Sequence, residues 1–252
     1  MKRYELTKEQ WDRIKPMLPP EETGKRGRPR KDNRTMLNGM LWIVRSGAQW
    51  RELPEAYGPW QSVYARFAKW RDDGTLERVF HTLSGDADME NLSVDSTCIK
   101  VHESANGGEK TADKAVGRTR GGLNTKIHAV VDGLGNPVEF LLSAGNDHDS
   151  VHAVELLEQV KLSGSNILAD RAYGAQAIRE YISERGASYV IPPQKNLSQP
   201  WPIDWHLYKE RHLIECFFQK IKWFWRVATR YDKLDVSFLA FVYLAAIAIL
   251  LL

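Results

Sequence analysis

Three acidic residues stand within or beside apolar segments of the chain. Asp95 lies inside a strand-like segment at residues 92–101, and Asp170 ends a short apolar strand pattern at residues 166–170. A carboxylate in such a place is costly to bury unless it faces a cleft, has a charged partner or binds a metal ion. For either aspartate alone, capping of a turn is the alternative interpretation.

The third carboxylate, Glu215, belongs to a polar stripe on a helix predicted over residues 205–224. At about 100° per residue, Tyr208, Arg211, Glu215 and Lys222 fall within a stripe about 60° wide. This stripe borders the apolar face of the helix and does not lie opposite it. A solvated helix edge with salt bridges at helical spacing is the alternative interpretation.

Together these side chains would form a site with only oxygen ligands. Such ligands suit Mg²⁺ or Mn²⁺ better than zinc. Two such ions can activate an attacking oxygen and stabilise a leaving oxygen on a phosphodiester. Arg211 could hold a phosphate through its two-pronged guanidinium, and Lys222 could hold one as a point charge.

Residues 1–90 read as a small all-α region. Thr7 and Gln10 fit a capping box, and helical spacing recurs from about residue 32 to 46, at 61–71 and at 75–83. This order resembles a helix-turn-helix unit, although most three-helix arrangements do not bind DNA. A basic linker without apolar residues joins the first two helices at residues 21–34.

From residue 91 the pattern changes to β-β-β-α-β-α-β-α-α. A meander followed by βαβ units predicts an α/β domain with a mixed sheet over residues 91–252. Residues 103–122 read as a loop, and residues 238–252 are all apolar. Because a membrane span needs about 20 residues, we expect a buried helix there.

Composition sets limits but does not identify a partner. The 252 residues carry a net charge of +3 and 43% hydrophobic residues, which excludes collagen-like and wholly disordered chains. The excess charge lies in residues 1–90, with 17 Lys and Arg against 14 Asp and Glu. Two distant cysteines, Cys98 and Cys216, and no signal-peptide pattern predict a cytoplasmic protein with reduced thiols.

The sequence resembles bacterial DDE transposases of insertion-sequence family five, within the larger group that shares a Tyr-Arg-Glu-Lys signature. Tyr208, Arg211, Glu215 and Lys222 match that signature in spacing. Asp95 in Val-Asp-Ser-Thr and Asp170 in Leu-Ala-Asp-Arg-Ala-Tyr match its two strand aspartates. Residues 120–128 and the Trp-Arg-Glu-Leu-Pro stretch at 50–54 also fit, so the resemblance covers nearly the whole chain.

The resemblance implies an RNase H-like catalytic domain in which Asp95, Asp170 and Glu215 are catalytic residues that bind Mg²⁺ or Mn²⁺, as two ions. It implies metal-dependent cutting at the ends of an insertion element and joining of the freed 3′-hydroxyl ends to target DNA. Tyr208, Arg211 and Lys222 would hold phosphates near the cut. Trp223 or Trp225 could stack on a flipped base, but we expect both to be buried.

The implied partner is double-stranded DNA in the bacterial nucleoid. Because the enzyme would act on the two ends of one element, the resemblance also implies a homodimer or larger assembly in the DNA complex. Candidate DNA contacts lie in the linker, on the outward face of residues 61–71, and in the loop: Lys25, Arg26, Arg28, Arg30 and Lys31; Tyr64, Arg66 and Lys69; Arg118 and Arg120. Solvated basic segments are the alternative for the linker and the loop.

Two further readings of the chain are open. One keeps the fold but limits the activity to DNA hydrolysis, and the other is a DNA-binding regulator with a vestigial catalytic centre. The chain also departs from many relatives, because only residues 194–203 separate the last strand from the glutamate helix. A hairpin intermediate supported by a larger insertion is therefore not expected.

Overall fold

The computed structural model describes residues 4–21, 31–105 and 115–252. Contacts divide the chain into two compact units, Met1–Gly85 with Ile221–Leu252, and Asp86–Lys220. The first unit is helical and the second contains the mixed sheet. Residues 221–252 group with the helical unit by their contacts, whereas the sequence analysis places them in the second domain. The predicted domain boundary between residues 90 and 91 stays a prediction.

Short helices with clear end signals form the first part of the helical unit. α1 (Lys8–Ile14) begins at Thr7 with the expected capping box to Gln10. α2 (Asn33–Ser46) begins at Asp32 and ends at Gly47, whose φ of 69° is the left-handed geometry that glycine tolerates best. α3 (Trp60–Asp72) and α4 (Thr75–Leu83) follow, with short 3₁₀ turns at Lys15–Met17, Trp50–Glu52, Glu55–Tyr57 and Ser84–Asp86.

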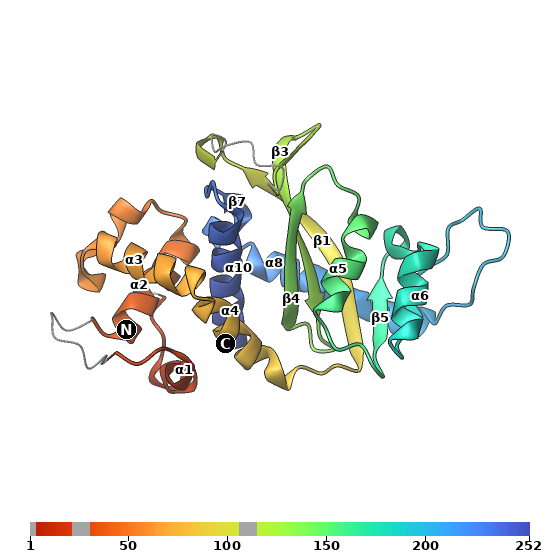
Figure 1. Cartoon of the computed structure of the whole chain (residues 1–252), viewed down its shortest axis with the longest axis horizontal. Coiled ribbons are helices and arrows are strands. Elements are labelled where there is room, and N and C mark those ends of the chain that lie inside the picture. Colours follow the sequence, from red (N-terminus) through yellow and green to blue (C-terminus); the bar gives the residue numbers. More distant parts are fainter. Residues whose placement is uncertain (1–3, 22–30, 106–114) are drawn as a thin grey trace. The chain divides into compact units, whose positions relative to one another are not determined.

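The apolar C-terminal segment forms the core helix of this unit. α10 (Asp235–Leu250) follows α9 (Trp225–Ala228) and the short strand β7 (Thr229–Arg230), and lies beside α4 (Figure 1). Phe241 is fully buried and stacks on Phe67 of α3, with ring centroids 4.6 Å apart. The prediction of a buried helix is confirmed. Within the described residues, no helix is both long and apolar enough to cross a membrane.

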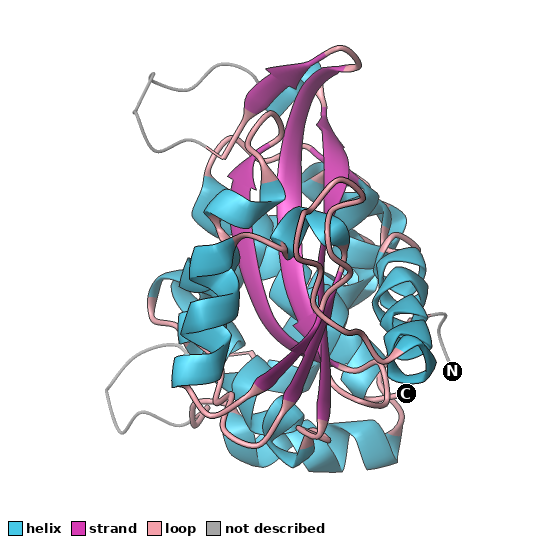
Figure 2. Cartoon of the chain, turned by 90° about the vertical axis from the view of Figure 1, so that its right-hand side faces the viewer, coloured by secondary structure: helices cyan, strands magenta, loops and turns pink. Residues whose placement is uncertain are grey.

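A twisted mixed sheet organises the second unit (Figure 2). β1 (Asn91–Val101) pairs antiparallel with β3 (Gly122–Val131), which pairs antiparallel with β4 (Pro137–Ala144). On its other edge β1 pairs parallel with β5 (Asn166–Ala169), and β5 pairs parallel with β6 (Ser188–Val190). The spatial order is therefore β4-β3-β1-β5-β6, which confirms the predicted mixed sheet.

Part of the predicted loop at residues 103–122 is a strand. β2 (Gly117–Thr119) pairs antiparallel with the start of β3. Its three residues carry little apolar pattern, so backbone pairing with a neighbouring strand decides its structure.

Helices cover the sheet and complete the core of this unit. α5 (Ala153–Glu158) packs on β3 and β4, and α6 (Gln176–Glu184) packs on β6. The 3₁₀ turns η6 (Asp149–Val151) and η7 (Arg171–Tyr173) lie against each other. Leu92 and Val94 of β1 join side chains of α5, β5 and α6 in one buried cluster.

The single helix predicted over residues 205–224 is wrong. The segment forms α7 (Trp205–Tyr208), the 3₁₀ turn η8 (Lys209–Arg211) and α8 (His212–Ile221). Two side-chain contacts tie η8 to β1: Asn91 donates to Glu210 at 2.9 Å, and Arg211 donates to Asp95 at 2.7 Å. These tertiary contacts favour the tighter turn, which the helical periodicity alone does not indicate.

Candidate active site

Asp95 and Asp170 occupy equivalent positions on two neighbouring parallel strands. Val94 of β1 is paired with Ala169 of β5, and each aspartate is the next residue along its strand direction. Because side chains alternate along a strand, Val94 faces the buried cluster with α5 while Asp95 points to the opposite face. The two carboxylates are close enough for the charge of Asp170 to act on Asp95.

Asp170 also caps a turn. Its Oδ1 accepts a hydrogen bond from the backbone N–H of Ala172 at 2.8 Å, at the start of η7. Capping was the alternative interpretation, and it applies here together with the position beside Asp95. One carboxylate oxygen is thus held by the backbone, which fixes the orientation of the side chain.

Arg211 joins the other two carboxylates. One terminal nitrogen donates to Asp95 Oδ2 at 2.7 Å, and the other donates to Glu215 Oε1 one helical turn later. The guanidinium carbon also lies 5.9 Å from the ring centroid of Tyr208. The structure therefore brings Tyr208, Arg211 and Glu215 together with Asp95, despite the break in the helix.

Burial is the main influence on the ionisation of Asp95. It raises the pKa of the Asp95 carboxyl, whereas the hydrogen bond from the backbone N–H of Ser96 and the charge of Arg211 lower it. The charges of Asp170 and Asp149 raise it further. Asp95 is therefore held in a setting that favours a nearby positive charge.

Asp149 is a fourth carboxylate next to the site. It begins η6 and accepts hydrogen bonds from Lys126 Nζ and from Ser96 Oγ, both at 2.7 Å. Burial raises the pKa of Asp149, but the hydrogen bonds from Lys126 and Ser96 and the charge of Lys126 outweigh it, so the pKa of Asp149 is lowered. His148 is exposed and bonds to Ser150.

The donor chemistry of the site fits a divalent cation. Asp95, Asp170 and Glu215 supply only carboxylate oxygens, as Mg²⁺ and Mn²⁺ prefer. Arg211 already places a positive charge between two of them. Over the residues described here, no three Asp, Glu, His or Cys side chains are close enough to hold a metal ion. Binding would therefore require these carboxylates to draw together.

Lys222 lies one residue beyond α8 with an exposed side chain. The prediction that Trp223 and Trp225 are buried is wrong, because their side chains are 65% and 67% exposed. α8 ends at Ile221, so neither tryptophan belongs to the apolar face of that helix.

The residues predicted to contact DNA differ in their exposure and in their partners within the protein. Tyr64 is exposed on α3, but Arg66 donates to Asn33 and lies over the ring of Trp70, and Lys69 pairs with Asp73 at 2.8 Å. Lys31, Arg118 and Arg120 are exposed. The remaining four predicted contacts fall outside the described residues: Lys25, Arg26, Arg28 and Arg30.

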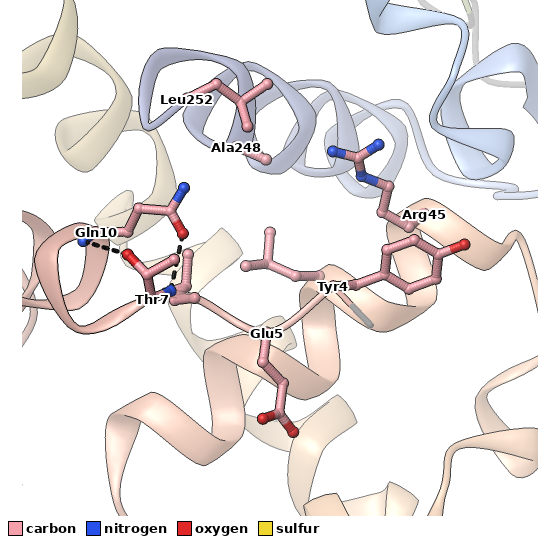
Figure 3. Close-up of a pocket in the computed structure, with 9 residues that line it drawn as sticks. Tyr4, Glu5, Thr7, Gln10, Arg45, Ala248 and Leu252 are labelled. Carbon is pink, nitrogen blue, oxygen red and sulfur yellow. Dashed lines mark hydrogen bonds between the residues drawn. The ribbon is translucent and has the colours of Figure 1, made fainter. Parts of the chain in front are cut away.

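A separate hollow of about 280 Å³ lies in the helical unit (Figure 3). It is bounded by the segment before α1 and by the end of α10, where Gln10 donates to the backbone carbonyl of Leu251 at 3.0 Å. Its lining includes Glu5 and Arg45 but none of the signature residues. It is therefore not part of the candidate active site.

A mixed sheet with one carboxylate within β1, one directly after β5 and a third on a following helix defines the RNase H-like class. The fold agrees with a solved structure titled as a piggyBac transposase synaptic complex with hairpin DNA. The TM-score is 0.52 at 11% identity, covering 96% of this chain and 69% of that chain. The RNase H-like prediction is confirmed at the level of the fold.

Family models identify the family. The model described as "Transposase DDE domain" matches residues 86–251, and that described as "Putative transposase of IS4/5 family" matches residues 6–80. The chain belongs to the DDE transposase family, and the resemblance seen in the sequence is confirmed.

Two curated relatives match about half of the chain. One is a protein of Brucella ovis named as a putative transposase for insertion sequence element IS6501, 42% identical over 124 residues. The match covers 49% of this chain and 95% of the relative. An uncharacterized protein of Sinorhizobium fredii is 38% identical over 118 residues, which cover 47% of this chain and 94% of that protein.

Proposed function

We propose that this chain cuts DNA at the ends of an insertion element and joins the freed 3′-hydroxyl ends to target DNA. One observation carries the proposal. In a member of the DDE transposase family, Asp95 and Asp170 stand side by side at the level where β5 ends, and Arg211 links Asp95 to Glu215. This arrangement on one sheet and one helix supports the assignment of the three carboxylates to one site.

In this proposal Asp95, Asp170 and Glu215 are the catalytic residues and hold Mg²⁺ or Mn²⁺. When bound, the ions supply an activated oxygen and neutralise charge on the scissile phosphodiester. The backbone cap on Asp170 leaves its other oxygen for a ligand. Arg211 exchanges a carboxylate for a phosphate oxygen when DNA arrives, since a guanidinium binds both through the same paired donors. Tyr208 and Lys222 hold neighbouring phosphates.

The proposed partner is double-stranded DNA, bound as a dimer or larger assembly that holds two element ends in the bacterial cell. The exposed Lys31, Tyr64, Arg118 and Arg120 support this proposal. Arg66 and Lys69 would first give up Asn33 and Asp73. If the linker Lys25, Arg26, Arg28 and Arg30 contacts phosphates, replacing these four by Gln reduces the salt dependence of binding.

The test is a joining assay on the DNA that flanks the coding region. Labelled duplexes with the flanking sequences, Mg²⁺ and a target plasmid are expected to give nicked ends and end–plasmid joints. Cleavage without joints would favour the hydrolytic nuclease. Binding without cleavage would favour the DNA-binding regulator and contradict the proposal. A control with Asp86→Asn, an exposed acid outside the site, is expected to match the unmodified chain.

A further inference from the structure

Ser96 connects two carboxylates at the edge of the candidate site. Its backbone N–H donates to Asp95 Oδ1 at 2.7 Å, and its hydroxyl donates to Asp149 Oδ1, also at 2.7 Å. Asp95 lies within β1, whereas Asp149 begins η6, 53 residues after Ser96. A contact with a distant part of the chain therefore reaches Asp95 through one intermediate residue.

Asp149 is itself held by Lys126 of β3. Lys126 Nζ donates to Asp149 Oδ1 at 2.7 Å and to the backbone carbonyl of Asp147 at 2.6 Å. Both side chains of this ion pair are mostly buried, with 13% of Lys126 and 24% of Asp149 exposed. Since Ser96 and Lys126 share one side of the sheet, Asp149 bridges the neighbouring strands β1 and β3.

Packing alone does not account for a charged pair at this place. Taking two charges out of water is unfavourable, and apolar side chains of similar volume often join elements with a smaller loss. Apolar side chains do join α5 to the same sheet, where Ala153 and Leu156 belong to the buried cluster. A carboxylate differs from them in offering a directed acceptor, and the donor that uses it on β1 is the Ser96 hydroxyl.

The backbone N–H of Ser96 holds one oxygen of the Asp95 carboxylate. The other oxygen, Oδ2, accepts from Arg211 at 2.7 Å. The pairing of β1 with β5 ends at Val94 and Ala169, so Ser96 lies past the last residue that β5 supports. Carboxylates that bind a metal ion are commonly oriented by a second layer of hydrogen-bonded side chains. Asp149 is suited to that task, because it anchors Ser96 where the support from β5 has ended.

We propose that Asp149 is a positioning residue, which orients the Asp95 carboxylate for a divalent cation by anchoring Ser96. Lys126 keeps Asp149 in place as the acceptor, and Ser96 in turn holds Oδ1 of Asp95. Oδ2 is then the oxygen left for a charged partner, Arg211 in the free chain and the cation when it binds. This inference rests on the proposed function, since it takes Asp95 as a cation ligand.

The test measures Mn²⁺ binding to the full chain without DNA, from the electron paramagnetic resonance signal of free Mn²⁺. Ser96→Ala, which removes only the hydroxyl, and Asp149→Ala are each expected to weaken binding by about tenfold, as is typical when a second-layer partner is lost. The double variant should bind no more weakly than the weaker single variant, because the two residues act through one bond. Asp149→Asn keeps an oxygen acceptor for Ser96 and is expected to restore most of the affinity.

Ser143→Ala is the matched control. Ser143 lies opposite Lys126 on β4, on the same side of the sheet, and its buried hydroxyl contacts His128 Nε2 at 2.8 Å. Loss of this hydroxyl is expected to lower the thermal midpoint about as much as Ser96→Ala does. Its Mn²⁺ affinity is expected to stay unchanged, so the control separates a loss of stability from a loss of positioning.

The outcomes separate the inference from the proposed function. If Ser96→Ala binds Mn²⁺ as tightly as the unmodified chain while Asp170→Asn does not, the positioning role is wrong and the metal site stands. Equal losses for Asp149→Asn and Asp149→Ala would assign the effect to charge and would overturn the inference. Equal losses of affinity for Ser96→Ala and Ser143→Ala would reduce it to stability and would overturn it too. If Asp170→Asn binds Mn²⁺ as well as the unmodified chain, the metal assignment fails, and the inference fails with it.

Discussion

Arg211 connects the candidate site in the free chain. Asp95 is only partly exposed and feels the charges of Asp170 and Asp149, so an uncompensated cluster would be strained by like-charge repulsion. The guanidinium lies against Asp95 and Glu215 and balances part of that charge. A bound divalent cation would balance the same charge, which makes arginine and cation alternative partners for these carboxylates.

This relation predicts the behaviour of Arg211→Gln. Without metal, the free energy of unfolding is expected to fall by about 1–2 kcal/mol, because Asp95 loses a charged hydrogen bond. Added Mg²⁺ is expected to stabilise this variant more than the unmodified chain. Thermal unfolding with and without Mg²⁺ measures both effects, with Arg185→Gln on the exposed end of α6 as control. An equal Mg²⁺ effect on both proteins would contradict the prediction.

The burial of His128 predicts how the stability of the protein depends on pH. Its side chain is 1% exposed and bonds through Nε2 to Ser143 at 2.8 Å, and burial lowers its pKa to about 4. Because the unfolded chain binds a proton near pH 6.5 and the folded chain does not, stability falls as pH drops from 6.5 toward 4. This single group contributes about 3 kcal/mol to that loss.

His128→Gln is expected to reduce the loss, since glutamine keeps a polar contact to Ser143 but does not titrate. Urea unfolding at pH 7 and pH 4.5 gives the comparison. The exposed His102→Gln is the control and should follow the unmodified chain. If His128→Gln loses as much stability between the two pH values as the unmodified chain, His128 is not responsible.

At the scale of elements, α10 shows how the apolar C-terminal segment is buried within the helical unit. It has buried side chains on all sides from Ser237 to Ile247 and packs against α2, α3 and α4. Phe241→Ala is expected to lower the free energy of unfolding by about 3–5 kcal/mol, as for other buried aromatic side chains.

Val236→Ala at the exposed start of the same helix provides the comparison, with a change expected to stay within about 0.5 kcal/mol. Urea unfolding of both variants measures the difference. Similar losses for the two variants would mean that helix propensity, and not packing of α10, determines the stability of this unit.

The elements also show what sequence alone could predict. Asp95 and Asp170 could be found because apolar strand patterns surround them, and parallel pairing then places them side by side. The break at η8 could not, because it depends on contacts of Glu210 and Arg211 with a strand more than a hundred residues earlier.

At the scale of the whole molecule, the net charge of +3 is unevenly distributed along the chain. Its excess lies in the first 90 residues, whereas residues 91–252, which hold the carboxylates proposed to be catalytic, carry 18 Lys and Arg against 18 Asp and Glu. The proposal needs both parts: exposed basic residues to hold DNA, and the acidic centre to cut and join it. A measurement on the joined product therefore tests the account as a whole.

The most direct measurement is joining by Asp170→Cys in Mg²⁺ and in Mn²⁺. Thiolate is a poor ligand for Mg²⁺ and a better one for softer ions. We therefore expect joining by this variant to fall at least about a hundredfold in Mg²⁺ and to recover partly in Mn²⁺. The unmodified chain and Asp86→Cys should join ends with either ion. Joining by Asp170→Cys in Mg²⁺ at the level of the unmodified chain would contradict the role of Asp170 as a metal ligand, and with it the proposed active site.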